Sequence, residues 1–349
     1  MDRRRGRRGR AGLGPGPGRA RPGRPARHRP ARGHRRRPGR RGREGAVIVD
    51  AHAHVFRPAA VRRRAADELA PAGRDAPAED LLAVMAASGI GRAVLVPLGP
   101  ETEYVAETRA AHPGRFASVA VAGPVIQGRR PDLDPDPPAA LRDLVAQGFS
   151  GLRTRWLGDP GRPLADSPML PVLRELADRG LPLWSYLPPD QLALLRELPR
   201  AVPGLRIVLN HLGFAPHGMR VDEHARPYFA DPFPPAVVDT VLELARHPHA
   251  YLMFSGQYAL SREAPPYKDL DGVVRAFADA YGTGRMLWAS DYPWTRDVPG
   301  PAELLELAGH VLPGLSPGER AALHGGTALS LFPGLASEAG PDTRDEWEG

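Results

Sequence analysis

Two histidines separated by a single residue stand out in the segment VIVDAHAHVF, residues 47–56. His52 and His54 follow a run of apolar and β-branched residues that is typical of a buried strand. Because side chains alternate between the two faces of a strand, both imidazoles would project from the same face. Histidine is the commonest metal ligand and a frequent general acid or base. The spacing therefore predicts a catalytic or metal-binding pair at the end of this strand.

Two further polar residues close apolar segments in the same way. His211 ends the run in RIVLNHLG, and Asp291 ends the run in RMLWASDYPW. Two or three imidazoles and a carboxylate suit one divalent ion, Zn²⁺ or Mn²⁺, with an open position for water. They equally suit acid–base chemistry without a metal. We predict His52, His54, His211 and Asp291 as catalytic residues; His52, His54 and Asp291 are the predicted metal ligands, and His211 is a further candidate.

Two arginines in the segment GLRTRW are candidates for binding an anion. Arg153 and Arg155 would share a face if the strand continues through both of them. A guanidinium fork matches a substrate carboxylate or a developing oxyanion. For Arg155, a salt bridge to Asp159 or Asp166 is an equally good interpretation. Arg153 is the stronger candidate because it lies nearer the predicted end of the strand.

Three more residues complete the predicted substrate-binding set. Tyr186 in LPLWSYLPP could donate a hydrogen bond to substrate or simply fill the barrel. Ser255 follows an apolar run and could position substrate. Trp294, three residues after Asp291, is a predicted pocket wall.

Short apolar runs alternate with helical patterns from residue 46 onward, which predicts parallel strands covered on both faces. The predicted strands are residues 47–50, 92–97, 116–122, 149–154, 181–187, 205–210, 250–255 and 285–290. The predicted helices are residues 78–88, 101–111, 139–147, 168–179, 189–198, 234–246, 269–281, 301–311 and 317–324. Eight such units favour an α/β fold of the (β/α)8 TIM-barrel type over an open doubly wound sheet. The long segments 55–77, 123–138, 211–233 and 256–268 all follow strands, so they would gather at the C-terminal face, where barrel active sites lie.

Composition limits the classes of protein that need to be considered. The chain has 349 residues, 42% of them hydrophobic, and no cysteine, which excludes disulfides, thiolate metal sites and a cysteine nucleophile. No stretch approaches the roughly 20 apolar residues of a membrane-spanning helix. We therefore expect a soluble, cytoplasmic protein, with a homo-oligomer as an open alternative.

Residues 1–45 differ sharply from the rest of the chain. They hold 18 arginines and two acidic residues, for a net charge of +16, whereas the remaining 304 residues carry −9. A segment of arginine, glycine, proline and alanine cannot bury enough apolar surface to offset its ordering entropy, so we expect a disordered tail. It could bind nucleic acid or an anionic surface, or be an extension without function, which we favour. The predicted organisation is a tail at 1–45, a barrel at 46–335 and a flexible C-terminal tail at 336–349.

The motifs HAH, NHLG and WASDYP, in this order and spacing, resemble the amidohydrolase superfamily. More narrowly, they are similar to the amidohydrolase-related group, amidohydrolase 2, which holds decarboxylases and lactone hydrolases. Residues 251–270, YLMFSGQYALSREAPPYKDL, resemble the branch of 2-pyrone-4,6-dicarboxylate hydrolase and sugar lactonases. The resemblance covers roughly residues 46–332 and implies a TIM barrel with hydrolase activity.

Departures from the family pattern narrow what the resemblance implies. Tyr186 stands where metal-binding members carry a histidine after the fifth strand, and no lysine in GLRTRW could bridge two metals. The resemblance therefore implies at most one divalent ion, and lactone-hydrolase members that work without a metal share the missing histidine. Phe214 follows NHLG where an arginine would serve a dicarboxylate, which argues against a substrate identical to theirs.

We therefore expect hydrolysis of a lactone or related cyclic ester in a small, oxygen-rich, carboxylated molecule, with Asp291 activating water. The alternative is a metal-dependent decarboxylase of an aromatic or unsaturated acid, in which His211 assists proton transfer. An alternative of another class is nucleic-acid or anionic-surface binding through residues 1–45, with an inert barrel.

Overall fold

The computed structural model describes residues 46–63, 74–98, 102–121, 137–223 and 226–336, all of which fall in one compact unit, Gly45–Gly349. The predicted tail at 1–45 and nearly all of the predicted C-terminal tail lie outside the described residues. So does most of the predicted loop 123–138. Among the helices that the structure describes, none is long and apolar enough to cross a membrane.

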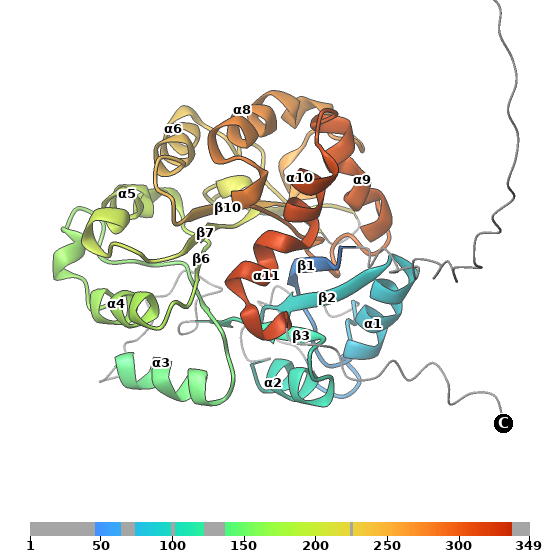
Figure 1. Cartoon of the computed structure of the whole chain (residues 1–349), viewed down its shortest axis with the longest axis horizontal. Coiled ribbons are helices and arrows are strands. Elements are labelled where there is room, and N and C mark those ends of the chain that lie inside the picture. The colour runs from blue at the N-terminus through green and yellow to red at the C-terminus, as the bar shows by residue number, and fades with distance from the viewer. Residues whose placement is uncertain (1–45, 64–73, 99–101, 122–136, 224–225, 337–349) are drawn as a thin grey trace, which may run out of the picture. The chain divides into compact units, whose positions relative to one another are not determined.

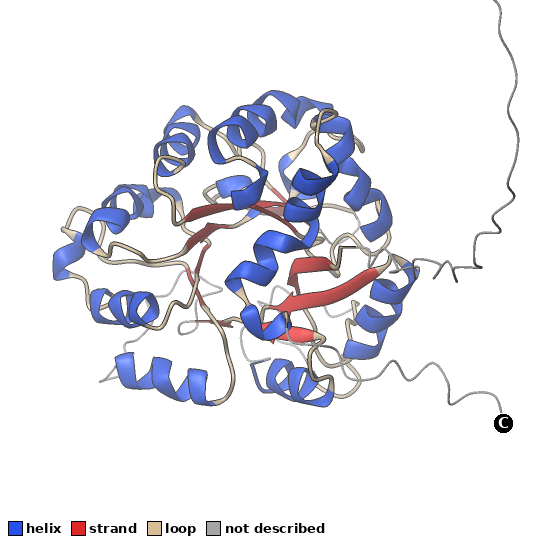
Figure 2. Ribbon diagram, in the orientation of Figure 1, coloured by secondary structure: helices blue, strands red, loops and turns tan. Residues whose placement is uncertain are grey.

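Short parallel strands form a barrel surrounded by helices (Figures 1 and 2). The strands are β1 (Ile48–Ala53), β2 (Ile90–Leu95), β3 (Phe116–Ser118), β4 (Ala120–Val121), β5 (Leu152–Thr154), β6 (Leu183–Ser185), β7 (Ile207–Leu209), β10 (Ala250–Phe254) and β11 (Met286–Trp288). They pair in the orders β1-β2-β3 and β11-β10-β7-β6-β5-β4. If β3 and β4 are counted as one strand, the described residues provide the eight strands of the predicted TIM barrel.

The barrel closes where the site residues lie. Ala53 and Tyr292 form a parallel bridge between β1 and the segment that follows β11. The His54 amide donates to the Tyr292 carbonyl at 2.8 Å, and the Asp291 amide donates to the His52 carbonyl at 3.0 Å. The two segments that carry HAH and SDYP are therefore neighbours through their backbones, before any side-chain contact is considered.

Helices follow most of the strands, as the sequence predicts. They are α1 (Ala78–Ala87), α2 (Thr102–Ala111), α3 (Pro137–Ala146), α4 (Leu170–Asp178), α5 (Leu192–Ala201), α6 (Pro235–Leu244), α7 (Gln257–Leu260), α8 (Asp271–Tyr281), α9 (Pro301–Val311), α10 (Pro317–Ala321) and α11 (Thr327–Leu331). A small antiparallel hairpin, β8 (Arg220–Val221) with β9 (Pro227–Tyr228), lies within the predicted loop 211–233.

Two of the predicted helices differ from the observed ones. The segment 189–198 begins as a short 3₁₀ turn and becomes α5 only at Leu192. The predicted helix 317–324 is divided into α10, a π-helical turn at Ala322–Gly326, and α11. The π-helical turn packs closely against the segment before β1, because a β-carbon on Gly325 would collide with the Val47 carbonyl.

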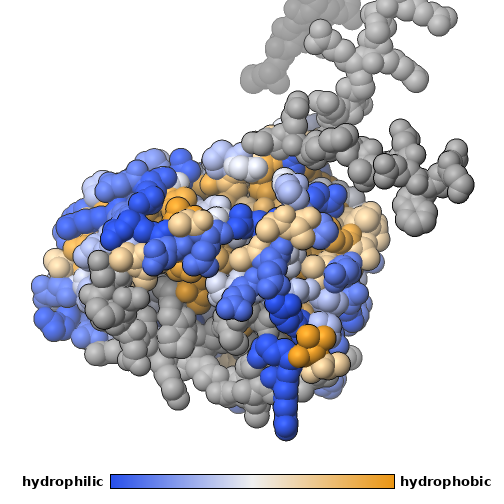
Figure 3. All heavy atoms as spheres, turned by 90° about the horizontal axis from the view of Figure 1, so that it is seen from below, coloured by the Kyte–Doolittle hydropathy of each residue, from blue (hydrophilic) through white to orange (hydrophobic). Residues whose placement is uncertain are grey.

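The barrel interior is apolar except at one end. The inward-facing side chains form one buried cluster together with Ala328, Leu331, Phe332 and Leu335 of the C-terminal segment. In Figure 1, α11 lies across the barrel in front of the strands. The C-terminal segment therefore plugs the interior near the start of β1, and the polar site occupies the opposite strand ends. On the face drawn in Figure 3, hydrophilic and hydrophobic residues are interspersed, as is usual for a protein surface.

Candidate active site

His52 and His54 owe their shared direction to an irregularity in β1. Val49 and Ala51 belong to the barrel-interior cluster, so strict alternation would turn the next even-numbered residues outward. The register between β1 and β2 shifts after Asp50. Such irregularities re-aim side chains next to active sites. The shift allows both imidazoles to face Asp291, and His54 also lines the pocket at this end of the barrel.

His211 and Asp291 stand on strained backbone. Their φ angles are 45° and 58°, in the left-handed region that residues other than glycine rarely adopt. Such strain costs about 1–3 kcal/mol and is concentrated at functional sites. Gly256 permits the position of His211, since a β-carbon on this glycine would lie 2.7 Å from the histidine Cβ. The fold thus holds both residues in place at a cost in stability.

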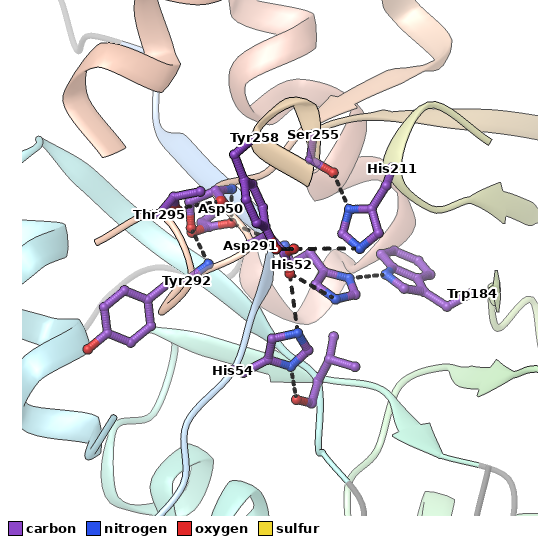
Figure 4. A network of polar contacts seen from close by, with 12 residues as sticks. Asp50, His52, His54, Trp184, His211, Ser255, Tyr258, Asp291, Tyr292 and Thr295 are labelled. Carbon is purple, nitrogen blue, oxygen red and sulfur yellow. Dashed lines mark hydrogen bonds and ion pairs between the residues drawn. The ribbon is translucent and has the colours of Figure 1, made fainter. Parts of the chain in front are cut away.

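The three imidazoles converge on the Asp291 carboxylate (Figure 4). His54 Nε2 lies 3.3 Å from Asp291 Oδ1, and His52 Nε2 lies 3.8 Å from the same oxygen. His211 Nε2 lies 3.8 Å from Asp291 Oδ2. All four side chains are buried, with at most 6% of each residue exposed. The structure therefore brings together the four residues that the sequence predicts as catalytic.

Each imidazole is oriented by a different kind of partner at Nδ1. The Trp184 indole N–H donates to His52 Nδ1 at 3.2 Å. His54 Nδ1 lies 2.7 Å from the Val96 carbonyl oxygen, which can only accept. His211 Nδ1 lies 2.8 Å from the Ser255 hydroxyl, which can donate or accept. These contacts fix the ring planes and leave each Nε2 directed toward Asp291.

The Asp291 carboxylate is held in its charged form. Burial by itself would raise its pKa, but His211, His54 and the Tyr258 hydroxyl, which donates at 2.7 Å, outweigh burial and lower the pKa to about 2. Burial also disfavours the charged form of two imidazoles, and there it is not outweighed. It lowers the pKa of His211 to about 4, although Asp291 counteracts it, and it lowers the pKa of His52 well below its usual value; neighbouring imidazoles and Arg153 act in the same direction as burial. Near neutral pH, an ionised carboxylate therefore faces neutral His52 and His211 rings.

A pocket opens above Asp291 and contains about 470 Å³ of empty space, including a part open to solvent. Its polar lining comes from His54, Arg153, His211, Tyr258 and Asp291. Its other walls are mainly apolar: Leu98, Phe214, Met219, Phe229, Leu260 and Trp294 are among them. The pocket therefore combines a small reactive centre with mostly apolar surroundings.

Arg153 is a buried cation without a carboxylate partner among the described residues. It is 6% exposed, and its guanidinium carbon lies 4.5 Å from the centre of the Tyr186 ring. Its Nε has no hydrogen-bond partner in the described part of the chain. Burial lowers its pKa, although Tyr186 and Asp291 counteract this effect. An unpaired buried charge is costly. Arg153 is thus the pocket group best suited to bind an anion.

The other predicted substrate-binding residues fall into two groups. Tyr186 and Trp294 line the pocket. Arg155 does not line it; β5 ends at Thr154, so the strand does not continue through both arginines, although the Arg155 guanidinium lies 5.3 Å from the centre of the Tyr186 ring. Ser255 does not line the pocket either, because it lies behind His211 and bonds to that ring. Its position indicates a role in orienting His211.

Sequence reasoning missed two residues that touch the reactive groups. Tyr258 lies in α7, inside a segment predicted as loop, and donates to Asp291. Trp184 lies in β6 and reads as ordinary core in the sequence. Only the pairing of β6 in the barrel brings its indole to His52, so no local signal could have identified it.

Asp50, two residues before His52, has a different role. Its carboxylate accepts hydrogen bonds from the Ser290 amide at 2.9 Å, from the Ser290 hydroxyl and from the His52 amide at 3.1 Å. Burial raises its pKa to about 6, although these bonds counteract the effect. Asp50 therefore links the first strand to the segment after the last one.

His52, His211 and Asp291 are placed where they could hold a metal ion. One ligand atom from each lies within 4.8 Å of the others. This group differs from the predicted ligand set in that His211 takes the place of His54. Ligation also requires an available lone pair on each nitrogen, which the spacing of the atoms does not establish.

The family model described as Amidohydrolase matches residues 49–334. The chain therefore belongs to this amidohydrolase family, and it is a hydrolase of that family. The family and enzyme class predicted from HAH, NHLG and WASDYP are confirmed.

Two curated proteins are similar over most of their length. L-fucono-1,5-lactonase of Burkholderia ambifaria is 28% identical over 230 residues, which is 64% of this chain and 72% of the relative. 4-Sulfomuconolactone hydrolase of Hydrogenophaga intermedia is 24% identical over 247 residues, 70% of this chain and 74% of the relative.

Solved structures share the fold. A candidate 2-pyrone-4,6-dicarboxylic acid hydrolase from Pseudomonas putida is 25% identical with a TM-score of 0.62, over 83% of this chain and 98% of that one. A zinc-bound amidohydrolase from Burkholderia multivorans is 23% identical with a TM-score of 0.63, over 82% of this chain and 99% of that one. The predicted TIM-barrel fold is confirmed.

Proposed function

We propose that this enzyme opens a lactone or related cyclic ester of a small carboxylated substrate, with water activated by Asp291. The observation that carries the proposal is the pairing, in one pocket, of the buried Asp291 carboxylate with a buried arginine that has no carboxylate partner among the described residues. The first group can take a proton from water, and the second can bind the carboxylate of a substrate.

The spacing around Asp291 suits a water molecule in the reacting position. Nε2 of His52 and Nε2 of His211 each lie 3.8 Å from a carboxylate oxygen. These separations are too long for direct hydrogen bonds and short enough for an oxygen placed between the groups to reach both. A water held there would be oriented by Asp291 on one side and an imidazole on the other.

The reaction then follows from the roles of the groups. Asp291 accepts a proton from the water while the oxygen of that water attacks the lactone carbonyl carbon. Imidazole N–H groups stabilise the negative charge that develops on the carbonyl oxygen. The ring C–O bond breaks, and the proton held by Asp291 passes to the leaving oxygen. One lactone and one water thereby give one hydroxy acid.

The pocket walls refine the expected substrate. The sequence suggested an oxygen-rich molecule, but Phe214, Phe229, Leu260 and Trp294 offer few partners for several hydroxyl groups. A buried hydroxyl without a hydrogen bond weakens binding. We therefore favour a lactone that carries one carboxylate on a mainly apolar skeleton over a polyhydroxylated sugar lactone.

The similar curated proteins support lactone opening, since one is named a lactonase and the other a lactone hydrolase. Metal-dependent decarboxylation, the alternative from sequence, has less support. Two decarboxylases among the solved structures, one of them 5-carboxyvanillate decarboxylase from Sphingomonas paucimobilis, are each 16% identical and share the fold alone. Binding of nucleic acid or an anionic surface by residues 1–45 concerns residues outside those described and stays a prediction.

A panel of lactones tests the proposal. The full chain is assayed against carboxylated lactones, the methyl esters of the same compounds and sugar lactones. We expect release of the hydroxy acid from at least one carboxylated member, with a lower kcat/KM for its methyl ester. Asp291→Asn is the control for contaminating activity. No turnover of any lactone, or turnover that Asp291→Asn leaves unchanged, would overturn the proposal.

A further inference from the structure

The contact between Trp184 and His52 has a consequence for the protons of the site. The indole nitrogen of tryptophan is a donor only. Its N–H lies 3.2 Å from His52 Nδ1, and both side chains are fully buried (Figure 4). His52 Nδ1 must therefore present its lone pair to Trp184. A ring proton at this nitrogen would set two donors against each other.

The single ring proton of His52 must then be on Nε2. This nitrogen faces the reactive centre, 3.8 Å from Asp291 Oδ1, and has no hydrogen-bond partner of its own among the described residues. A carboxylate oxygen is an acceptor, so an N–H group there is the electrostatically favourable arrangement. His52 thus presents a donor to whatever oxygen lies in front of Asp291.

His54 has the reverse arrangement. Its Nδ1 faces the Val96 carbonyl oxygen, which can only accept, so Nδ1 carries a proton. Ligating histidines almost always donate their second ring N–H to a carbonyl or carboxylate in this way, which leaves the Nε2 lone pair for the ion. His54 has the second contact that a metal ligand needs, and His52 does not.

Trp184 is firmly held in its orientation. It is the middle residue of β6, paired with Arg153 on β5 and with Val208 on β7. Its ring packs edge-on against Phe332 of the C-terminal plug, with 5.3 Å between ring centroids. The indole therefore cannot turn away from His52 without disturbing the barrel interior.

We infer that Trp184 is a positioning residue that fixes His52 as an Nε2–H donor and so opposes a divalent ion bound through His52. His52, His211 and Asp291 are placed to hold an ion, but a proton on His52 Nε2 leaves this nitrogen without a lone pair to offer it. The N–H of His52 is instead directed at an oxygen of water or substrate. The inference does not depend on lactone opening, because proton positions and metal affinity can be measured without a substrate.

Nitrogen NMR on the wild-type chain tests the proton position directly. Protein labelled with ¹⁵N-histidine is measured near neutral pH without added metal, and His52→Gln identifies the signals of this ring. We expect a protonated Nε2 and an unprotonated Nδ1. A protonated Nδ1 on His52 would overturn the inference.

Zinc titration of two matched variants tests the role of Trp184. Trp184→Phe removes the indole N–H and keeps an aromatic ring. Trp288→Phe does the same at another buried tryptophan, whose N–H donates to the Leu304 carbonyl at 3.1 Å, away from the site. Changes behind a metal ligand typically alter affinity about 10–100-fold. We expect Zn²⁺ to bind Trp184→Phe at least about tenfold more tightly than wild type or Trp288→Phe.

Equal zinc affinity in the three proteins would overturn the inference, as would equal tightening in both variants. In Trp184→Phe, the His52 signals should also show a rise in the form protonated at Nδ1. If this variant does not fold, the NMR result on the wild-type chain decides the matter by itself.

Discussion

Two buried aspartates near the junction between the first and last strands have pKa values that are shifted in opposite directions. Asp50 and Asp291 are 1% and 5% exposed, yet the pKa of Asp50 is raised to about 6 and that of Asp291 is lowered to about 2. Burial raises the pKa in both cases. The partners make the difference: Asp50 has uncharged donors from Ser290 and His52, whereas Asp291 faces imidazoles and a tyrosine hydroxyl.

The comparison shows how one short region serves both structure and chemistry. The Asp50 carboxylate joins the first strand to the segment after the last strand. Asp291 faces the pocket, and its Oδ1 has no hydrogen-bond partner in the part of the chain that the structure describes. We therefore expect changes at Asp50 to act mainly on stability and changes at Asp291 to act mainly on turnover.

The largest effect is expected for Asp291→Asn. General base catalysis contributes about 10²–10⁴-fold, so kcat should fall by a factor in this range while the melting temperature changes little. Asp297→Asn, an exposed neighbour, is the matched control and should retain wild-type turnover. A large loss of stability without a loss of kcat would remove the proposed division of roles.

Arg153→Met should weaken recognition of the substrate carboxylate. Hydrogen bonds to charged groups contribute about 1.5–3 kcal/mol, so kcat/KM for the acid should fall roughly 10–100-fold. The methyl ester should lose less. Arg155→Met, which alters a guanidinium over the same Tyr186 ring but outside the pocket lining, should have the smaller effect. Equal losses for acid and ester would show that Arg153 does not bind the carboxylate.

Asp50→Asn should destabilise the fold by about 1–3 kcal/mol, because the amide NH₂ would face existing donors. Denaturant unfolding at pH 5 measures this change. The pKa of Asp50 is raised on folding, so its protonation favours the folded state. This contribution is complete below about pH 4 and is lost as the pH rises through about 6. Between pH 4 and 7, the stability of the variant should therefore fall less than that of wild type. An equal fall in both proteins would contradict the raised pKa of Asp50.

Tyr258→Phe should have the smallest effect. It removes one donor to Asp291 and leaves the imidazoles in place, so we expect a rise in the pKa of Asp291 and a fall in kcat of no more than about tenfold. Tyr281→Phe loses a comparable hydroxyl hydrogen bond, to the Val241 carbonyl, and neither residue lines the pocket. Its turnover should match wild type. An equal fall in kcat in both variants would show that the Tyr258 hydrogen bond has no specific role at Asp291.

Much of the fold could be predicted because most strands of the barrel are nearly continuous apolar sequence, and polar site residues stand at or just after the ends of β1, β7 and β11. His52, His54, His211 and Asp291 were recognisable for the same reason, since parallel strands bring their C-terminal ends together. Local pattern was sufficient here because one rule, the common direction of the strands, determines which residues meet.

The missed features depend on distant contacts. The register shift in β1, the reach of Trp184 to His52 and the role of Asp50 depend on the pairing of strands far apart in sequence. The predicted position of Arg155 failed because β5 ends at Thr154, whose side chain accepts from the Trp156 amide at 3.1 Å. The domain boundaries at 45 and 335, a cytoplasmic location and a homo-oligomer stay predictions.

The state of charge of Asp291 is the point on which water activation depends, and a ¹³C carboxyl NMR titration measures it. Asp50→Asn and Asp291→Asn identify the two signals in protein labelled with ¹³C-aspartate. We predict that the Asp291 signal keeps its ionised position from pH 8 down to about 4, whereas the Asp50 signal moves with a midpoint near 6. An Asp291 carboxyl that is still protonated at pH 7 would contradict the account.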